Sequence, residues 1–263
     1  MSVDTSLTGP GLTCRNLTLR YSSGPVIDRL SLTLPPGASL AVVGESGCGK
    51  STLLTALAGL RSIDGGTVSW QTAQGDRPLS AIRSSFVWQS LGLFPWKRVK
   101  ENLALSLSLL GVEGEEAQAR MRDMLAELKL TGLENRFPSE LSGGQRQRLA
   151  LGRALIVRPD VLFMDEPFSA LDAMLRERLQ EFLITLRRAH PCTVILVTHD
   201  ISEAAVLGSH VLMLASGPSR VLDFFENPAF SAESGAAARE HPAFYETVRR
   251  IHAGLREAAR EAE

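Results

Sequence analysis

The sequence is poor in cysteine: Cys14, Cys48 and Cys192 are the three among 263 residues. They are odd in number and widely spaced, and they form neither a CxxC pair nor a Cys/His ligand pattern. We therefore expect neither a disulfide framework nor a cysteine-based zinc site. A reducing cytosol is the simplest compartment for such a chain.

Long apolar runs are also missing. The longest, residues 103–112, contains Ser106 and Ser108 and is far shorter than the roughly 20 residues that a membrane-spanning helix needs. Residues 1–6 have neither the positive flank nor the apolar core of a signal peptide. We therefore expect a chain that does not cross a bilayer by itself and is not exported.

No excess of either charge is present, since the formal net charge is −1. This balance gives no broad attraction to nucleic acid or to anionic lipid, so we expect no nucleic-acid partner. The 44% of hydrophobic and 22% of charged residues are ordinary for a globular protein, and 263 residues suffice for a substantial core. Function must therefore be inferred from local motifs.

The strongest motif is a glycine-rich stretch at residues 44–52, which fits the GxxxxGK[ST] spacing of a phosphate-binding loop, or P-loop. An apolar run precedes it and a helix-prone segment follows, which disfavours the alternative of a simple strand-to-helix turn. The glycines let backbone N–H groups and a helix N-terminus face an anion. Lys50 is expected to reach the β- and γ-phosphates, Ser51 to ligate Mg²⁺ and Thr52 to bind phosphate. The predicted loop comprises Gly44, Glu45, Ser46, Gly47, Cys48, Gly49, Lys50, Ser51 and Thr52.

The hydrophobic pattern predicts an α/β fold. Alternation over 13–21 and 26–34 predicts two paired, half-buried strands. Continuous apolar runs at 39–43, 161–164 and 193–197 are typical of parallel strands that helices cover on both faces.

The remaining segments are assigned from their turn residues and from the spacing of their apolar residues. Residues 64–78 and 85–89 are interpreted as a small antiparallel patch. A helical insertion is expected at about 90–157, with helical character over 103–130. Near the end, an apolar stripe of Phe244, Val248, Ile251 and Leu255 predicts a helix that packs on the protein's own core, with a regulatory role as the alternative.

Chemically capable residues follow two of the buried strands, and the carboxyl ends of parallel strands are where open α/β sheets bind ligands. Asp165 is predicted to coordinate Mg²⁺ either directly or by holding another ligand of the ion. Glu166 is predicted to orient and deprotonate an attacking water. His199 could hydrogen-bond both phosphate and water, although a histidine there is often structural. Tyr21 ends an early strand and could offer a flat face to adenine, with core packing as the alternative.

A second phosphate-binding surface is predicted at Leu141-Ser142-Gly143-Gly144-Gln145. Ser142 can cap the helix that follows, and the two glycines leave backbone amides free to face an anion. This pentapeptide resembles the signature motif of ATP-binding cassette (ABC) ATPases. The resemblance covers about residues 11–221, because every motif of that family occurs in order.

The resemblance implies a role for each motif. Tyr21 would stack on adenine, residues 44–52 would be the Walker A loop, and Gln89 would sense Mg²⁺ and the γ-phosphate. Residues 161–166 would be the Walker B strand with Glu166 as the catalytic glutamate. The remaining matches are a D-loop at 169–172 and a switch histidine, His199.

The family also implies an architecture and partners. The fold would be a P-loop NTPase core with an antiparallel β patch and an inserted helical subdomain, forming an ATPase domain at 11–221 before a helical tail at 222–263. Two subunits would pair head-to-tail, each ATP being capped by Ser142, Gly143, Gly144 and Gln145 of the other. ATP and Mg²⁺ are the implied cofactors. Separate transmembrane permease subunits, and indirectly a substrate-binding protein, would place the chain at the cytoplasmic face of the inner membrane.

Within that family, the stretch Leu-Phe-Pro-Trp at 93–96 resembles the ATPase subunits of nitrate, sulfonate and taurine importers. The lack of the long C-terminal β-domain found in sugar and polyamine importer cassettes agrees with this assignment. Phe94, Pro95 and Trp96 are predicted to dock on the permease, unless Trp96 simply caps the helical lobe. An exporter or lipoprotein-release ATPase is the alternative function. A cassette that acts on DNA or ribosomes would have a coiled-coil insertion, a second cassette or a basic surface. A GTPase would have the base-recognising motif Asn-Lys-x-Asp. The sequence shows none of these features.

Overall fold

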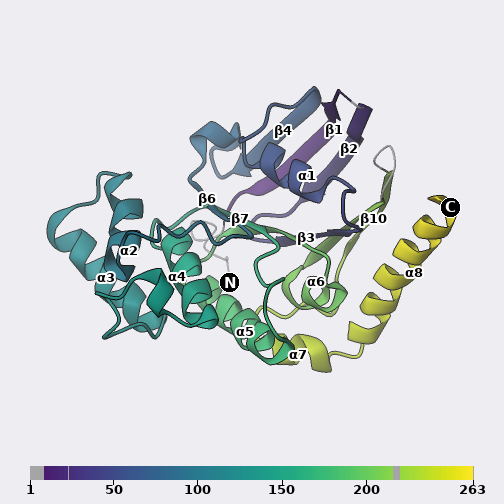
Figure 1. The fold of residues 1–263 in the computed structure, drawn as a ribbon. Coiled ribbons are helices and arrows are strands. Elements are labelled where there is room, and N and C mark those ends of the chain that lie inside the picture. Colours follow the sequence, from purple (N-terminus) through teal and green to yellow (C-terminus); the bar gives the residue numbers. More distant parts are fainter. Residues whose placement is uncertain (1–8, 23, 216–219, 263) are drawn as a thin grey trace, which may run out of the picture.

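The computed structural model describes residues 9–22, 24–215 and 220–262. Its centre is a six-stranded sheet with the strand order β10-β9-β3-β8-β7-β6 (Figure 1). The five strands from β9 to β6 are parallel, and β10 pairs antiparallel with β9 at one edge. The strands are β3 (Ser39–Gly44), β6 (Ser84–Val87), β7 (Val161–Asp165), β8 (Thr193–Thr198), β9 (His210–Ala215) and β10 (Arg220–Glu226).

A second, antiparallel sheet has the order β2-β1-β4-β5. It contains the predicted strand pair, since β1 (Gly11–Tyr21) and β2 (Gly24–Leu34) lie side by side with Leu12 opposite Leu34. The other members are β4 (Gly65–Thr72) and β5 (Gly75–Arg77). Helix α1 (Lys50–Leu57), which follows the P-loop, lies between the two sheets (Figure 1).

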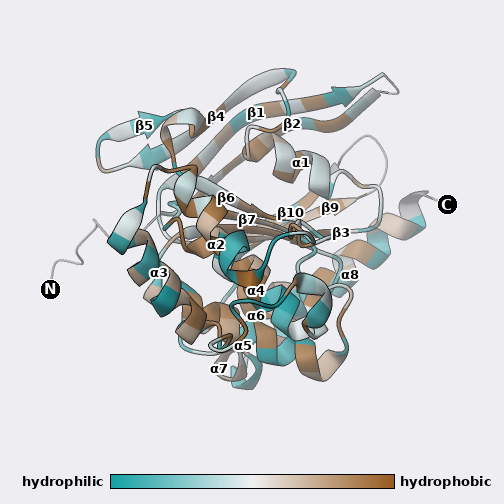
Figure 2. Ribbon diagram, turned by 60° about the vertical axis from the view of Figure 1, so that its left-hand side comes forward, coloured by the Kyte–Doolittle hydropathy of each residue, from teal (hydrophilic) through white to brown (hydrophobic). Residues whose placement is uncertain are grey.

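Side chains alternate across the large sheet and so build two cores. Val42, Phe163 and Ile195 face α1 and the antiparallel sheet, whereas their sequence neighbours Val43, Met164 and Leu196 face the helices on the other side. Because both faces are covered, the central strands β3, β7 and β8 are mainly hydrophobic, as Figure 2 shows, whereas the edge strand β6 begins with two serines.

The helices cover the opposite face and form a lobe at the β6 edge. The lobe holds α2 (Val99–Ser108) and α3 (Gly114–Glu127), and α4 (Gly143–Leu155) joins it to the sheet (Figure 1). The other helices are α5 (Ala173–Ala189), α6 (Ile201–Leu207), α7 (Gly235–Glu240) and α8 (Phe244–Ala262), with short 3-10 turns at Leu79–Ala81 and Pro138–Glu140. No helix in the described ranges has the length and apolar character to span a membrane.

Two of the expectations are wrong in detail, and one strand was not predicted. Residues 84–87 form β6, which pairs parallel with β7 at the edge of the large sheet and does not join the antiparallel patch. The helix expected over 103–130 is interrupted, since Gly111 and Gly114 adopt φ values of 70° and 64° between α2 and α3. Strand β9, between β3 and β10, was not expected at all.

The C-terminal segment begins with a strand and ends with the expected helix. Residues 222–226 of the predicted helical tail belong to β10. In α8, Phe244 and Ile251 are buried, and Val248 and Leu255 are partly buried against the same core. The predicted stripe therefore packs on the body of the protein.

Candidate active site

The P-loop connects β3 to α1, and its glycines are required by geometry. Gly47 and Gly49 adopt φ values of 82° and 98°, in the left-handed region that glycine tolerates best. A Cβ on Gly44 would lie 2.3 Å from the Leu214 carbonyl oxygen, and one on Gly49 would lie 2.5 Å from Val26 Cγ1. The two glycines therefore let the loop pack closely against β9 and β2 where it leads into a helix N-terminus, which is suited to bind an anion.

Lys50 lies inside this loop. Its ammonium group donates to the carbonyl oxygens of Gly44 at 2.8 Å and Glu45 at 2.7 Å, and the side chain is almost fully buried. The loop's own carbonyls thus hold the charge where the sequence predicts phosphate. Glu45, Ser46 and Gly47 are exposed, so the outer side of the loop is open.

Ser51 meets Asp165 across the sheet. The Ser51 hydroxyl donates to Asp165 Oδ1 at 3.0 Å, which joins the first turn of α1 to the end of β7. Burial raises the pKa of the Asp165 carboxyl above its ordinary value, and the neighbouring Glu166 charge adds to this, although the hydrogen bond from Ser51 opposes it. A hydroxyl and a poorly compensated carboxylate are oxygen donors that suit a hard cation such as Mg²⁺.

Glu166, Gln89 and His199 come together at the carboxyl ends of β6, β7 and β8. Gln89 Nε2 donates to Glu166 Oε2 at 3.3 Å, and His199 Nδ1 lies 3.2 Å from the same oxygen. Glu166 has a φ of 44°, an uncommon value for a residue with a side chain. Such strain is often found at functional sites, and here the Glu166 amide is held by the Val197 carbonyl at 2.9 Å.

Tyr21 lies beside the P-loop helix and is half exposed. Its hydroxyl is 3.4 Å from Thr52 Oγ1, and the Arg61 guanidinium lies 4.0 Å from its ring centroid. One ring face is therefore covered by a cation, which the sequence analysis did not predict because the two residues are far apart in the chain.

The signature stretch starts α4, as predicted. Ser142 Oγ accepts from the Gln145 amide at 3.3 Å, and Gln145 Oε1 accepts from the Ser142 amide at 2.8 Å, a reciprocal cap. Gly144 packs against α5, where an added Cβ would lie 2.9 Å from Leu175 Cδ1. Ser142 and Gln145 thus use these hydrogen bonds for each other, at the start of their own helix.

Comparison with known proteins identifies the family. Residues 27–169, more than half of the chain, match the family model described as ABC transporter. The chain belongs to the ABC transporter family.

Two relatives and one solved structure are similar to this chain over most of its length. The taurine import ATP-binding protein TauB of Pseudomonas syringae pv. tomato is 39% identical over 89% of this chain and 90% of its own length. The aliphatic sulfonates import ATP-binding protein SsuB 2 of Xanthomonas axonopodis pv. citri is 43% identical over 80% of this chain and 69% of its own. An inward-facing metal-chelate type ABC transporter structure shares 27% identity, with a TM-score of 0.69 over 83% of this chain and 84% of that one. The predicted family, the P-loop NTPase fold and the ATPase activity of an ABC cassette are thereby confirmed.

The sequence did not predict a polar network that joins residues next to the ABC motifs. Arg176 forms an ion pair with Asp200, next to His199, and donates to the Leu171 carbonyl in the D-loop at 2.9 Å. Asp200 also caps α6 by accepting from the Glu203 amide at 3.0 Å. Asp200 could have been found from its place directly after His199, but Arg176 lies in an ordinary amphipathic helix.

Proposed function

We propose that the chain is the ATP-hydrolysing subunit of an importer for sulfonates such as taurine, or for nitrate or a similar small solute. The observation that carries this proposal is the similarity to import ATP-binding proteins for taurine and aliphatic sulfonates, which extends over 80% to 89% of the chain. The Leu-Phe-Pro-Trp stretch at 93–96, which follows β6 after a short turn, supports the same group.

ATP binding would use the residues that the motifs predict. The backbone amides of residues 44–52 would surround the phosphates, with the Lys50 ammonium turning from its loop carbonyls toward the γ-phosphate. Tyr21 would support adenine with the ring face that Arg61 leaves uncovered. Ser51, Asp165 and Gln89 would hold Mg²⁺, which when bound neutralises phosphate charge.

Hydrolysis would depend on Glu166. Its carboxylate would accept a proton from the attacking water as the water approaches the γ-phosphorus. Gln89 and His199 both contact Glu166 Oε2, so they would fix the direction in which the carboxylate points. His199 is more than half exposed and could reach the γ-phosphate side of the site.

The signature residues would act on a second copy. The hydrogen bonds of Ser142 and Gln145 join these two residues to each other at the start of α4, and a helix N-terminus is suited to bind phosphate. We therefore assign them to the ATP of a head-to-tail partner. Residues 11–221 would form the ATPase domain, about 90–157 its helical subdomain and 222–263 its C-terminal extension. The chain would attach peripherally to permease subunits at the cytoplasmic face of the inner membrane, and a binding protein would deliver the solute.

Uptake measurements test this proposal. Cells that lack this chain should lose uptake of labelled taurine, an alkanesulfonate or nitrate, and the wild-type chain should restore it. Glu166→Gln should not restore uptake, whereas Glu240→Gln, a change at the exposed end of α7, should restore it fully. If uptake of all three solutes is unaffected by the deletion while lipoprotein release or export is lost, the importer assignment is wrong.

A further inference from the structure

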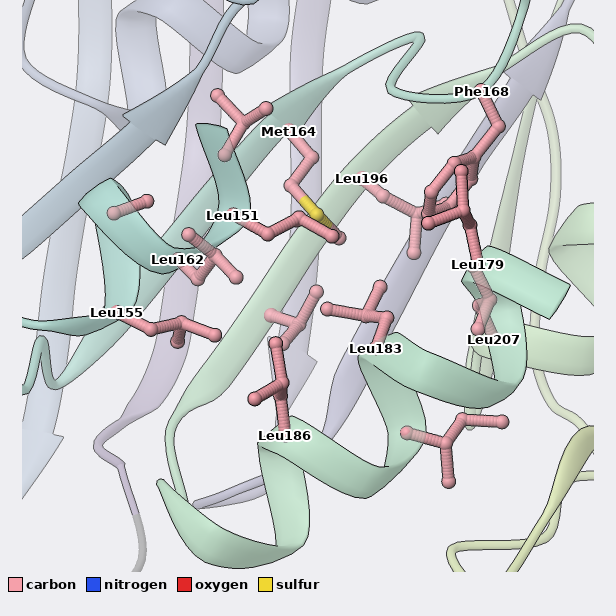
Figure 3. Packing of buried hydrophobic residues seen from close by; sticks show 14 of the residues in the cluster. Leu151, Leu155, Leu162, Met164, Phe168, Leu179, Leu183, Leu186, Leu196 and Leu207 are labelled. Carbon is pink, nitrogen blue, oxygen red and sulfur yellow. The ribbon is translucent and has the colours of Figure 1, made fainter. Parts of the chain in front are cut away.

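A cavity of about 250 Å³ lies on the helix-covered side of the large sheet, away from the nucleotide site. Gly37 and Cys192, which precede β3 and β8, line it at the amino ends of the strands, whereas the P-loop lies at their carboxyl ends. Its walls are mainly apolar and include Met164, Leu183 and Leu207, which Figure 3 labels. Apolar cavities of about 150 Å³ already bind benzene-sized ligands, so this volume can hold a longer hydrocarbon group.

Two charged side chains line this cavity: Arg188 is exposed, whereas Arg187 is partly buried. Arg187 of α5 lines the cavity together with Phe230, and its guanidinium carbon is 5.9 Å from the centroid of the Phe230 ring. Its Nη2 donates to the Gly37 carbonyl and its Nε to the Cys192 carbonyl at 3.4 Å. Nη1 makes no hydrogen bond with any described residue.

The charge of Arg187 has no carboxylate partner among the described residues. Arg176 and Arg250, by contrast, pair with Asp200 and Asp223. Burial lowers the pKa of Arg187 below its ordinary value, and the nearby Cys192 opposes this shift. A partly buried cation with only carbonyl partners favours an anion that brings two acceptor oxygens, because a guanidinium binds such groups through two parallel hydrogen bonds.

We propose that this cavity is a binding site for an amphiphilic organic anion, with its sulfonate or carboxylate head on Arg187 and its alkyl chain between α5, α6 and β7. The site goes beyond the proposed ATPase function and does not depend on it. Ser231 lines the same cavity and adds a polar group to its wall. The apolar wall selects the tail, and the guanidinium selects the charge.

Calorimetric titration of the full chain without nucleotide tests the site. Octane-1-sulfonate and octanoate, below their micelle concentrations, should bind at one site per chain. Ethanesulfonate, which has the same head but cannot fill the cavity, should bind at least about a hundredfold more weakly. Octylamine, which has the same tail but the opposite charge, should not bind. Equal binding of octylamine, or no binding of either octyl anion, would overturn the proposal.

Variants locate the binding. Arg187→Gln should weaken octane-1-sulfonate binding at least about tenfold, and Arg187→Lys less, because a charged hydrogen bond is lost in the first and retained in part in the second. Arg178→Gln, an exposed change on the same helix, is the matched control and should leave binding unchanged. If Arg187→Gln does not fold, Ala232→Trp, at an exposed lining position, should block the cavity in a folded chain. Unchanged affinity in folded Arg187→Gln or Ala232→Trp would contradict the proposal.

Discussion

At the residue scale, Glu166 is the side chain on which we propose that hydrolysis depends. Glu166→Gln should keep ATP affinity while lowering turnover by roughly 10²- to 10⁴-fold, because an amide cannot accept the proton from water. ATP should then persist and hold two subunits together. Phosphate release and size-exclusion chromatography with Mg-ATP measure both effects, and ATP-dependent dimers are expected only in the variant. Phosphate release at the wild-type rate would remove Glu166 from the mechanism.

Glu203 is expected to make the stability of the protein depend on pH. The side chain is buried, Thr198 Oγ1 donates to its Oε2 at 2.9 Å, and Oε1 has no partner. Burial, reinforced by the nearby charges of Asp200 and Glu166 and opposed by Thr198 and Arg176, raises the pKa of Glu203 from 4.5 to about 8. Between these values the folded chain holds a proton that the unfolded chain lacks, so the free energy of unfolding should fall as pH rises from 4.5 to about 8.

A comparison of Glu203→Gln with the wild type isolates this effect. The glutamine has no proton to lose, so its unfolding free energy, measured with urea at several pH values, should change less across the same range. The advantage of the variant should therefore grow with pH. Parallel curves for the two proteins would show that Glu203 does not cause the pH dependence.

Cys48 is predicted to report on the P-loop without being needed for its chemistry. The thiol is buried, and burial raises its pKa above the ordinary value, so it should react slowly with maleimide at neutral pH and faster as the pH rises. Cys48→Ser should have near wild-type ATPase activity, because the loop needs only a small residue there. Mg-ATP should protect both the thiol and the activity from a bulky maleimide. Equal labelling rates with and without Mg-ATP would contradict the assignment of the loop.

At the element scale, α8 stabilises the domain through its apolar stripe. Ile251 is fully buried, and two polar contacts add to the packing: Arg250 with Asp223 at 2.7 Å and Thr247 with Asn227 at 3.1 Å. Ile251→Ala should cost about 2–5 kcal/mol of unfolding free energy. Tyr245→Ala, an exposed change on the same helix, should cost little.

Thermal unfolding and ATPase assays distinguish this structural role from regulation. Ile251→Ala, or deletion of residues 241–263, should lower the melting temperature while activity per folded molecule changes little. A normal melting temperature combined with altered activity would instead favour a regulatory role for α8.

Some strands of the large sheet could be predicted from the sequence and others could not. Strands β3, β7 and β8 were predicted because strands buried on both faces are uniformly apolar, and their polar ends correctly placed Asp165, Glu166 and His199 at one edge. Strand β6 was assigned to the wrong sheet: it is four residues long, with only Val87 buried, so its pattern does not show which strand it joins. Strand β9 carried an apolar run, Val211 to Ala215, that was overlooked although it resembles β8.

At the scale of the whole molecule, the two predicted phosphate-binding surfaces lie in different parts of the fold. The P-loop is packed between the sheets, and the signature stretch is at the start of α4, where its hydrogen bonds are used for its own cap. Motif spacing predicted each surface but could not predict their separation, which follows from the helical lobe between β6 and β7. Contacts such as Arg61 on Tyr21 and Arg176 on Asp200 join distant segments and leave no local pattern.

Attachment to a permease requires a surface that the isolated chain leaves exposed, and Trp96 offers one. Trp96 is 71% exposed, while Phe94 beneath it is held by tilted ring packing at 5.7 Å and by Arg153 at 5.4 Å from its ring. Asn102 fixes the loop further, since its side chain accepts from the Phe94 amide at 2.9 Å and donates to the Lys97 carbonyl at 2.9 Å. A rigid loop that presents an exposed indole a few residues after Gln89 is suited to transmit changes at the γ-phosphate to a partner.

Trp96→Ala should therefore separate coupling from catalysis. Truncation of an aromatic anchor can cost an interface about 2 kcal/mol or more, whereas an exposed side chain contributes little to the fold. The variant should fold, bind ATP and hydrolyse it when isolated, yet fail to co-purify with the permease or to be stimulated by it. Tyr245→Ala removes a similarly exposed aromatic ring from α8 and should assemble normally. If Trp96→Ala assembles and supports uptake at the wild-type rate, the loop is not the docking surface, and the support that residues 93–96 give to a sulfonate-type importer is lost with it.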